Sequence, residues 1–289
     1  MDRKYGKILG INVSSTSNAK VLAFVRSSLI NKRKFYIVTP NPEIVLAAQK
    51  DKKLAEIINN STLAIADGVG LSQAAKFLSM PSPKNIILRF PICFFQGLWV
   101  GLATFFDKNW LFEELRPIKG RELFIELVRL ANKKHWKIYL LGGKSKEAEF
   151  AAKRLRVNYK GIKIDYSNGP ILDITGKPIN NFEREKEKET LKKINGYSPE
   201  LLFVGFGAPK QEKWLYRWLS KLNIGGGMVV GGLSYVSGAG RLPPKWMEES
   251  GLEWIWRLLT QPQRIRRILN AWPIFPLTVF WYKVNIKQA

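Results

Sequence analysis

Between residue 8 and about residue 230, short apolar runs alternate with longer stretches in which apolar and polar positions recur with helical spacing. The short runs predict strands at residues 35–39, 63–66, 137–141, 162–165 and 201–204. The longer stretches predict helices at residues 42–58, 69–78, 120–134 and 181–194, with a further helix ending near residue 157. Residues 201–204 form the last clear strand before a glycine-rich stretch at 225–232. The alternation is typical of α/β proteins, and we predict a Rossmann-like, largely parallel sheet flanked by helices.

An apolar segment at about residues 85–112 interrupts this alternation. Its central part, residues 86–106, reaches the roughly 20 residues that a helix needs to cross a bilayer, although Arg89, Pro91 and Gln96 weaken that interpretation. Its tryptophan and phenylalanine side chains suit the boundary between lipid headgroups and water. An interfacial or re-entrant segment, a buried helical hairpin and a hydrophobic subunit interface all remain open.

The composition changes again beyond residue 240. Residues 243–259 and 262–269 predict short helices separated by proline, and the apolar tail at 271–282 is too short to span a bilayer. Arginines interleaved with tryptophans favour a helix that rests on anionic lipid. We therefore predict a catalytic domain at 1–240, which contains the apolar insert, and a basic amphipathic appendage at 241–289.

The charge balance indicates an anionic partner. The chain carries 47 Lys and Arg against 23 Asp and Glu, a formal net charge of +24. Nucleic acid, an anionic membrane and a phosphorylated substrate all fit such a charge. Cys93 is the single cysteine and His135 the single histidine, which argues against a disulfide framework and against a multi-histidine metal site. The apolar run at residues 8–13 is too short for a secretory signal, so we expect the catalytic part in the cytoplasm.

Polar residues follow two of the predicted strands. Asp67 and Gly68 come directly after the strand at 63–66, whereas Thr39 ends the strand at 35–39 and Asn41 follows it. The carboxyl ends of parallel strands form one edge of the sheet, where α/β proteins bind ligands. Asp before Gly is also common in turns, and Thr and Asn commonly cap helices, so these simpler roles compete with catalysis.

Two glycine-containing loops are expected at the same edge. The first contains Gly205 and Gly207, followed by Lys210 and Gln211 in the first turn of a helix, where solvated side chains are the alternative to ligand binding. The second, Gly142-Gly143-Lys-Ser, could bind a diphosphate through backbone N–H groups. Neither is a nucleotide-binding fingerprint: Ile138 stands where a Walker A loop needs glycine, and Lys210 where a dinucleotide motif needs its third glycine. A nucleoside diphosphate fits, whereas ATP hydrolysis and NAD chemistry gain no support.

Six motifs in order resemble the WecG/TagA/CpsF family of bacterial glycosyltransferases, which act in teichoic acid, common antigen and capsule synthesis. They are Thr39-Pro-Asn-Pro-Glu43, Ala66-Asp-Gly-Val-Gly70, Arg116-Pro-Ile-Lys-Gly120, Leu140-Leu-Gly-Gly143, Gly205-Phe-Gly-Ala-Pro-Lys-Gln-Glu212 and Pro244-Lys-Trp-Met with Gly251-Leu-Glu-Trp-Ile-Trp-Arg257. The resemblance covers nearly the whole chain except about residues 82–112. It implies transfer of an N-acetylmannosamine-type sugar from a UDP donor to an undecaprenyl-diphosphate-linked sugar, with inversion and without a metal or another cofactor.

The resemblance also assigns residues. The catalytic carboxylate of the family corresponds to Asp67, and its polar site residues correspond to Thr39, Asn41 and Gln211. Arg116 matches the family arginine that precedes the glycine motif. The arginines of the family's C-terminal appendage correspond approximately to Arg257, Arg264 and Arg267, for which attraction to anionic lipid is an equal alternative.

This chain departs from the family at two places. Where the family usually has Asp after Arg-x-x-Gly, the chain has Gly120-Arg121-Glu122, and the apolar insert is not typical of the family. A UDP-sugar transferase with a soluble acceptor therefore remains an alternative. A basic nucleic-acid-binding protein is another, although the dispersal of the basic residues along the chain speaks against it. We expect the enzyme at the inner face of the cell membrane, and the sequence leaves homo-oligomerisation open.

Overall fold

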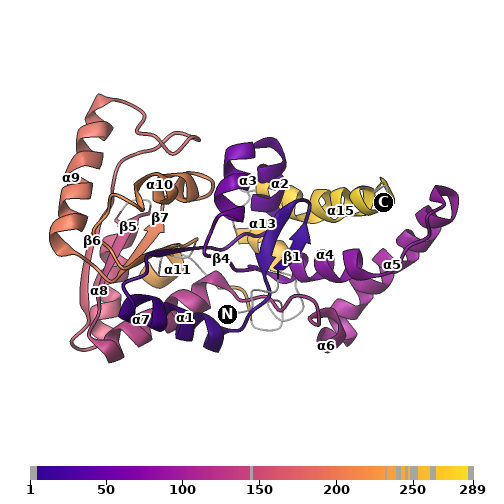
Figure 1. The fold of residues 1–289 in the computed structure, drawn as a ribbon, viewed down its shortest axis with the longest axis horizontal. Coiled ribbons are helices and arrows are strands. Elements are labelled where there is room, and N and C mark those ends of the chain that lie inside the picture. Colours follow the sequence, from indigo (N-terminus) through magenta and orange to yellow (C-terminus); the bar gives the residue numbers. More distant parts are fainter. Residues whose placement is uncertain are drawn as a thin grey trace.

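The computed structural model describes residues 5–143, 146–231, 233–238, 242–244, 247, 253–260 and 265–285. Within these residues, six parallel strands form the main sheet, in the order β4-β3-β8-β7-β5-β6 (Figure 1). The strands are β3 (Phe35–Val38), β4 (Leu63–Ala64), β5 (Lys137–Gly142), β6 (Lys163–Ser167), β7 (Leu201–Gly205) and β8 (Gly226–Val229). The predicted α/β fold with a parallel sheet is therefore confirmed.

Strand β8 lies in the glycine-rich stretch at 225–232, where no strand was predicted. It pairs with β3 on one side and β7 on the other, near the middle of the sheet. Its glycines leave room for large neighbours, because a Cβ atom on Gly226 would lie 2.3 Å from the ring of Phe35, and one on Gly227 would lie 2.7 Å from Leu215. The pattern rules failed here because the strand has little hydrophobic side chain of its own.

Helices cover both faces of the sheet. Leu201 and Phe203 of β7 point to one face and Leu202 and Val204 to the other, as the period of two along a strand requires. The first face is covered by α1 (Asn18–Ile30), α7 (Gly120–Lys134), α8 (Glu147–Asn158) and α11 (Leu233–Ser237). The second is covered by α2 (Pro42–Lys50), α3 (Lys52–Asn59), α9 (Asn181–Tyr197) and α10 (Lys210–Trp218).

Several features of the N-terminal half were not predicted, including the helix α1. An antiparallel hairpin of β1 (Tyr5–Ile8) and β2 (Ile11–Ser14) lies beside the sheet edge, where Ser14 forms a parallel bridge with Ile65. The helix predicted at residues 42–58 is divided in two at Asp51. This residue ends α2 and caps α3, because its Oδ1 accepts a hydrogen bond of 3.0 Å from the Leu54 N–H.

A helical lobe extends beyond the sheet (Figure 1). It consists of α4 (Val69–Ser79), α5 (Ile86–Phe106), α6 (Lys108–Leu111), the short π-helix η2 (Asn270–Ile274) and α15 (Phe275–Asn285). The intervening C-terminal helices are α13 (Glu253–Thr260) and α14 (Ile265–Leu269). By length and composition alone α5 could cross a membrane. Only 22% of its most apolar window is buried inside the protein, so most of that window is exposed. The alternative that the insert is a buried hairpin is therefore wrong for most of its surface.

Candidate active site

Asp67 lies at the carboxyl end of β4, as predicted. Its backbone N–H donates to the Pro40 carbonyl at 2.9 Å, which joins the segments that follow β4 and β3. The half-buried carboxylate accepts a hydrogen bond of 3.2 Å from the Gly120 N–H, the first residue of α7. The start of a helix favours negative charge, so this position suits a carboxylate. Gly68 follows with a φ of +93°, a backbone conformation that suits glycine.

The other predicted residues of the β3 loop contact the same region. Thr39 is buried against Gly120, where a Cβ atom would lie 3.3 Å from the Thr39 methyl carbon. Asn41 caps α2, since its Oδ1 accepts a hydrogen bond of 2.9 Å from the Ile44 N–H. The capping role that the sequence left open for Asn41 is therefore present, and the Asn41 oxygen is engaged in it.

The segment before α7 brings Arg116 to this edge. The Ile118 N–H donates to the Ala66 carbonyl at 2.9 Å, so the segment runs alongside the end of β4. Ser15, in the loop after β2, donates its hydroxyl to the Glu114 carbonyl at 3.1 Å and fixes the other side of the segment. Arg116 itself is exposed, which leaves its guanidinium at the rim of the site.

The loop after β7 uses its polar residues to hold its own shape. Gln211 is buried, accepts a hydrogen bond of 3.0 Å from the Gly207 N–H and donates to Glu212 at 3.1 Å. Lys210 donates to the Leu172 carbonyl at 2.6 Å. In this conformation Gln211 therefore positions the glycine loop, and substrate contact by Gln211 or Lys210 stays a prediction.

The glycines after β5 lie next to this loop. The Gly143 N–H donates to the Gly205 carbonyl at 2.9 Å, and Gly142 and Gly143 both have a positive φ. An Oε atom of Glu147, in the first turn of α8, would lie 3.0 Å from a Cβ atom on Gly143. The negative charge of this carboxylate would repel a diphosphate bound at the start of α8. Diphosphate binding by this loop therefore also stays a prediction. Lys144 and Ser145 of this motif lie outside the described residues.

The strand order determines how these parts lie together. Thr39 and Asp67 follow neighbouring strands, whereas Gly205 belongs to β7, two strands from β3 and so about 10 Å away. A small hollow of about 40 Å³ lies between α2, α3 and the loop after β7, and its lining residues are Glu43, Ile44, Ala47, Leu54, Ala208 and Pro209. The predicted strand-end residues thus share one edge of the sheet. The predicted appendage residues cannot be placed relative to this edge, because the side chains of Arg257, Arg264 and Arg267 lie outside the described part of the chain.

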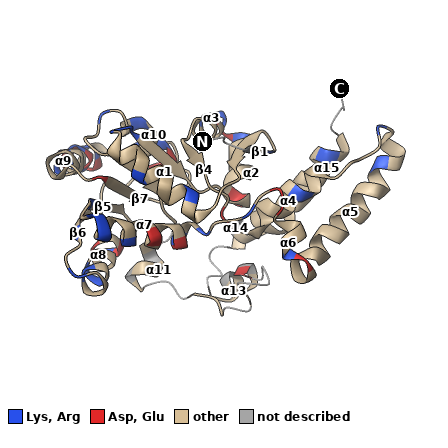
Figure 2. Ribbon diagram, turned by 60° about the horizontal axis from the view of Figure 1, so that its bottom comes forward, with Lys and Arg blue, Asp and Glu red and all other residues tan. Residues whose placement is uncertain are grey.

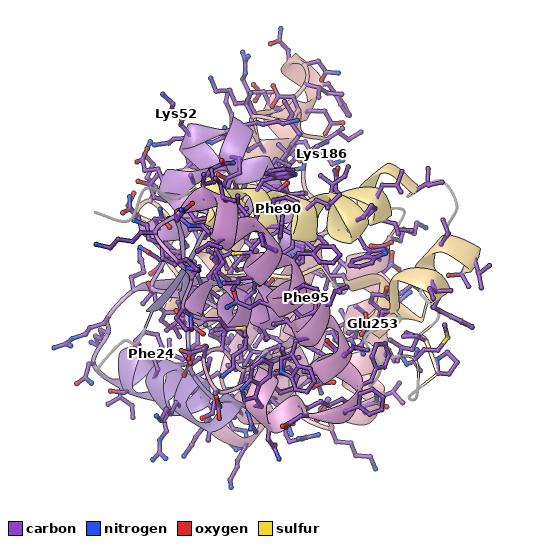
Figure 3. The ribbon with its side chains drawn as sticks, turned by 90° about the vertical axis from the view of Figure 1, so that its right-hand side faces the viewer. Phe24, Lys52, Phe90, Phe95, Lys186 and Glu253 are labelled. Carbon is purple, nitrogen blue, oxygen red and sulfur yellow. The ribbon has the colours of Figure 1, made fainter. Side chains whose placement is uncertain are left out.

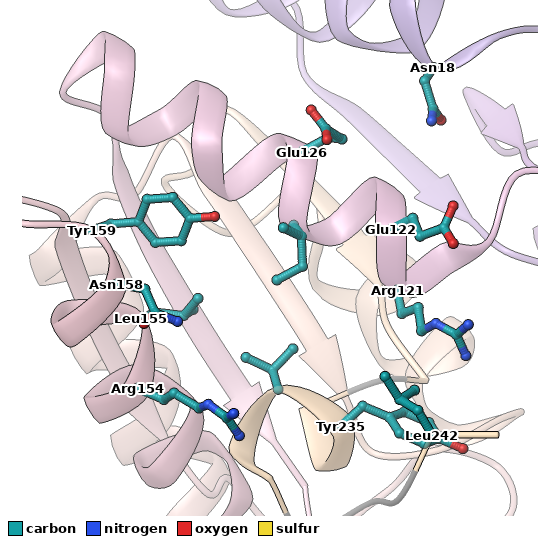
Figure 4. Close-up of a pocket in the computed structure, with 12 residues that line it drawn as sticks. Asn18, Arg121, Glu122, Glu126, Arg154, Leu155, Asn158, Tyr159, Tyr235 and Leu242 are labelled. Carbon is teal, nitrogen blue, oxygen red and sulfur yellow. The ribbon is translucent and has the colours of Figure 1, made fainter. Parts of the chain in front are cut away.

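A larger hollow of about 510 Å³ lies between α7, α8 and α11 (Figure 4), and Asp67 is not among the residues that line it. Arg121 and Glu122 line one end of it, and the Arg121 guanidinium lies 6.0 Å from the centre of the Tyr235 ring. Arg121, which stands where the family usually has Asp, therefore lies at this hollow together with Glu122. Among the described residues, no three His, Cys, Asp or Glu side chains are grouped as metal ligands.

Sequence reasoning missed Ser15 and Gly120 as parts of the site. The polar run that follows the apolar residues 8–13 was an available signal for Ser15, because it marks another strand end at the same edge. No local signal indicates that the Gly120 N–H meets Asp67, since these residues are 53 positions apart.

Comparisons with known proteins agree with the motifs. The model of the family described as "Glycosyl transferase WecG/TagA/CpsF family" matches residues 6–88 and 109–289, and most of α5 falls in the gap between the two matched parts. A protein of Staphylococcus aureus (strain MRSA252) is 29% identical over 98% of this chain and 94% of its own length. A protein of strain NCTC 8325 / PS 47 is also 29% identical with the same coverage. Both are named N-acetylglucosaminyldiphosphoundecaprenol N-acetyl-beta-D-mannosaminyltransferase.

Proposed function

The chain belongs to the WecG/TagA/CpsF glycosyltransferase family, and from this premise we propose that it transfers an N-acetylmannosamine-type sugar from a UDP donor to an undecaprenyl-diphosphate-linked sugar. The names of the staphylococcal relatives supply the transferred sugar and the lipid-linked acceptor. The wide coverage of both chains supports carrying the reaction over. The product would enter the synthesis of a cell-surface polysaccharide.

The observation that carries the mechanism is the position of Asp67. It lies at the carboxyl edge of the sheet, beside the Thr39 loop and at the start of α7. In the proposed reaction the carboxylate removes the proton from the acceptor hydroxyl while that oxygen forms a bond to C1 of the donor sugar. The bond between C1 and the β-phosphate oxygen breaks, its electron pair leaves with UDP, and the configuration at C1 inverts.

The leaving diphosphate needs positive charge, and arginines are suited to supply it. Guanidinium groups bind phosphate oxygens with two parallel hydrogen bonds and remain charged at all relevant pH values. Arg116 is exposed at the rim of the site, and Arg257, Arg264 and Arg267 would approach from the appendage. In this proposal the arginines and the loop N–H groups, rather than a metal ion, stabilise the leaving group.

The location follows from the acceptor. An undecaprenyl chain stays in the bilayer, so the enzyme would work at the inner face of the cell membrane. The net charge of +24 and the exposed apolar side chains of the helical lobe both support contact with anionic lipid. With a soluble acceptor, neither feature would have a role in the reaction.

A donor screen tests the proposal. A panel of UDP-sugars is incubated with a short-chain prenyl-diphosphate-linked acceptor, and the product is identified by mass spectrometry and by the anomeric coupling in its NMR spectrum. We expect turnover with an N-acetylmannosamine donor, inversion at C1, and no loss of activity in EDTA. Turnover with soluble sugars alone would support the soluble-acceptor alternative, and the absence of turnover with every donor would contradict the proposal.

A further inference from the structure

We propose that α5, held in place by α15, lies in the plane of the membrane with its outer face immersed in the lipid of the cytoplasmic leaflet. This inference rests on the proposed function for the presence of a membrane, but it assigns the contact to a helix that most of the family match leaves out. It names the bilayer as the occupant of an apolar surface that is otherwise open to water.

The outward face of α5 is apolar along its whole length. Phe95 is 67% exposed and Phe106 is 85% exposed. The other large exposed side chains of the helix are Ile86, Ile87, Leu88, Phe90, Ile92, Phe94, Leu98, Trp99, Leu102 and Phe105. Figure 3 faces this lobe and labels Phe90 and Phe95 on α5, and in Figure 2 the same helix is tan along most of its length. So large an exposed apolar surface is unusual for a protein that meets only water.

The single charged side chain of α5 is turned away from this face. Arg89 is buried, and its guanidinium donates to the carbonyls of Pro83 at 2.6 Å, Lys84 at 2.7 Å and Val284 at 3.0 Å. The last of these belongs to α15, so the charge that weakened a membrane interpretation of the sequence is used to fasten two helices together. Lipid contacting α5 would not meet it.

The polar groups at the centre of α5 are used in the same way. Lys283 of α15 donates to Gln96 Oε1 at 2.7 Å and also to the Phe77 carbonyl of α4. The Gln96 amide donates to the Pro81 carbonyl at 2.7 Å. These contacts join the inner sides of α4, α5 and α15, so the outer surface of α5 presents apolar side chains.

The apolar surface continues from α5 onto α15. Phe90 contacts Phe280 and Trp281, with ring centres 5.5 and 6.0 Å apart. Leu277, Trp281 and Tyr282 of α15 are exposed, as are Trp272 and Ile274 of η2. Two helices from distant parts of the chain thus form one surface, whose aromatic residues suit the interfacial region of a bilayer.

The packing of α5 favours an in-plane position over a spanning one. Its buried residues Arg89, Cys93, Val100, Ala103 and Thr104 recur along one side from near its start to near its end. A spanning helix in this lobe would have to draw α4 and α15 into the bilayer with it. An in-plane helix needs lipid on one side only, which is the side that is exposed.

Charge favours a bilayer over a second copy of the chain. Lys84 and Lys108 are exposed at the two ends of α5, where they would meet anionic headgroups. A dimer formed through this face would instead bring together two chains that each carry a net charge of +24. Anionic lipid offsets this charge, and another copy adds to it.

Vesicle binding by the full chain tests the proposal. The test variant is Phe95→Glu with Leu102→Glu, and the matched control is Val157→Glu with Phe182→Glu, which charges two exposed apolar positions on α8 and α9. Circular dichroism first checks that both remain folded. Co-sedimentation with vesicles of phosphatidylethanolamine and phosphatidylglycerol should then weaken about tenfold or more for the test variant, with no change for the control.

Equal binding by the test variant and the wild type would overturn the proposal. So would a stable dimer in sedimentation equilibrium that the test variant dissociates, because α5 would then be a subunit interface. The binding measurement uses neither donor nor acceptor, so its failure is distinguishable from a failure of sugar transfer.

A fluorescence measurement tests the depth of α5. In a Cys93→Ala background, Phe95→Cys and Val157→Cys are each labelled with a nitrobenzoxadiazole dye. Lipids brominated on the acyl chain should quench the dye at residue 95 and not at residue 157. In the same background, Lys84→Cys should react with an impermeant thiol reagent added on the protein's side of sealed vesicles. Protection of Lys84→Cys from that reagent would indicate a spanning helix and contradict the in-plane position.

Discussion

The Asp67 carboxylate has two separable roles at the start of α7. It accepts a hydrogen bond from the Gly120 N–H, which caps the helix, and it lies where the proposed transfer needs a base. A cap requires an oxygen acceptor, whereas a base requires a carboxylate that can take a proton. Asn supplies the oxygen without the basicity, and Ala supplies neither.

We therefore expect Asp67→Asn to fold normally and to lose activity. Its free energy of unfolding should stay within about 0.5 kcal/mol of the wild type, while transfer falls by about 10²- to 10⁴-fold. Asp67→Ala should lose the same activity and about 1 kcal/mol of stability. Urea denaturation and product formation measure the two effects. Near-normal turnover by Asp67→Asn would leave Asp67 only its capping role.

Local patterns predicted some residues of the site and not others. Thr39, Asn41 and Asp67 were predicted because each lies at or just after the end of a predicted strand, and strand ends share one edge. The strand end before Ser15 was an available local signal. The contact by which Ser15 fixes the segment that carries Arg116 had none, because it joins positions 99 residues apart. The hydrogen bonds of Gln211 also depend on how its loop is folded, which its position in a motif does not reveal.

Lys283 provides a prediction about pH. Burial lowers its pKa to about 8, although the nearby Cys93 thiol opposes this effect. Between about pH 8 and its ordinary pKa of 10.5, the unfolded chain binds more protons at this residue than the folded chain does. The contribution of Lys283 to stability is therefore least favourable below pH 8 and improves as the pH rises through this window.

The comparison of Lys283 with Lys283→Met isolates this effect. Both chains should carry Cys93→Ala, because the charge of that thiol is coupled to the charge of Lys283. From about pH 7 to pH 10.5, stability should change in favour of the Lys283 chain by roughly 2–3 kcal/mol relative to Lys283→Met. Urea denaturation at the two pH values measures the difference. A constant difference would show that burial does not perturb this lysine.

At the scale of elements, helices and strands were predicted correctly where their own side chains show a clear apolar pattern. The helix at Gly120–Lys134 was predicted to the residue, because its apolar positions recur with helical spacing. Strand β8 was missed because its glycines have no side chains to show a pattern. They are required by the Phe35 ring and Leu215, which fill the space beside them. A strand of small residues at the centre of a sheet is visible only once the surrounding strands are in place.

This explanation of β8 predicts opposite effects for two glycine substitutions. Gly226→Ala would place a methyl group 2.3 Å from the Phe35 ring and should cost about 1–3 kcal/mol or more. Gly196→Ala, in the α9 helix with no atom within 4 Å of the new methyl group, should add up to about 1 kcal/mol. Thermal and urea denaturation measure both. A neutral Gly226→Ala would mean that Phe35 moves aside easily.

At the scale of the whole molecule, the two segments that suggested a membrane contact form one structure. The sequence placed them in an insert at 85–112 and an appendage at 241–289, with nothing to connect them. In the fold, Arg89 bonds to Val284, 195 positions away, and Lys283 bonds to Phe77, 206 positions away. Sequence patterns predicted the character of both segments but could not predict that α15 completes the lobe built around α5.

Removal of residues 241–289 tests this arrangement. The α/β domain keeps its sheet and the helices on both faces, so we expect a folded protein with a cooperative thermal transition. The lobe loses the contacts of Phe275, Val279 and Val284, which are buried in the intact chain. Transfer should fall by about 10²-fold or more, because the proposed appendage arginines and the support for α5 are removed together.

Cys93 reports the state of the lobe in this experiment. In the intact chain it is buried, and burial raises the pKa of its thiol, so it should react slowly with Ellman's reagent. In the truncated protein it should react at nearly the rate of the denatured chain, while the α/β domain stays folded. A control that lacks only residues 286–289 keeps α15 and should protect Cys93 fully. Slow reaction of Cys93 in the truncated protein, combined with full activity, would show that α15 neither supports the lobe nor contributes to transfer.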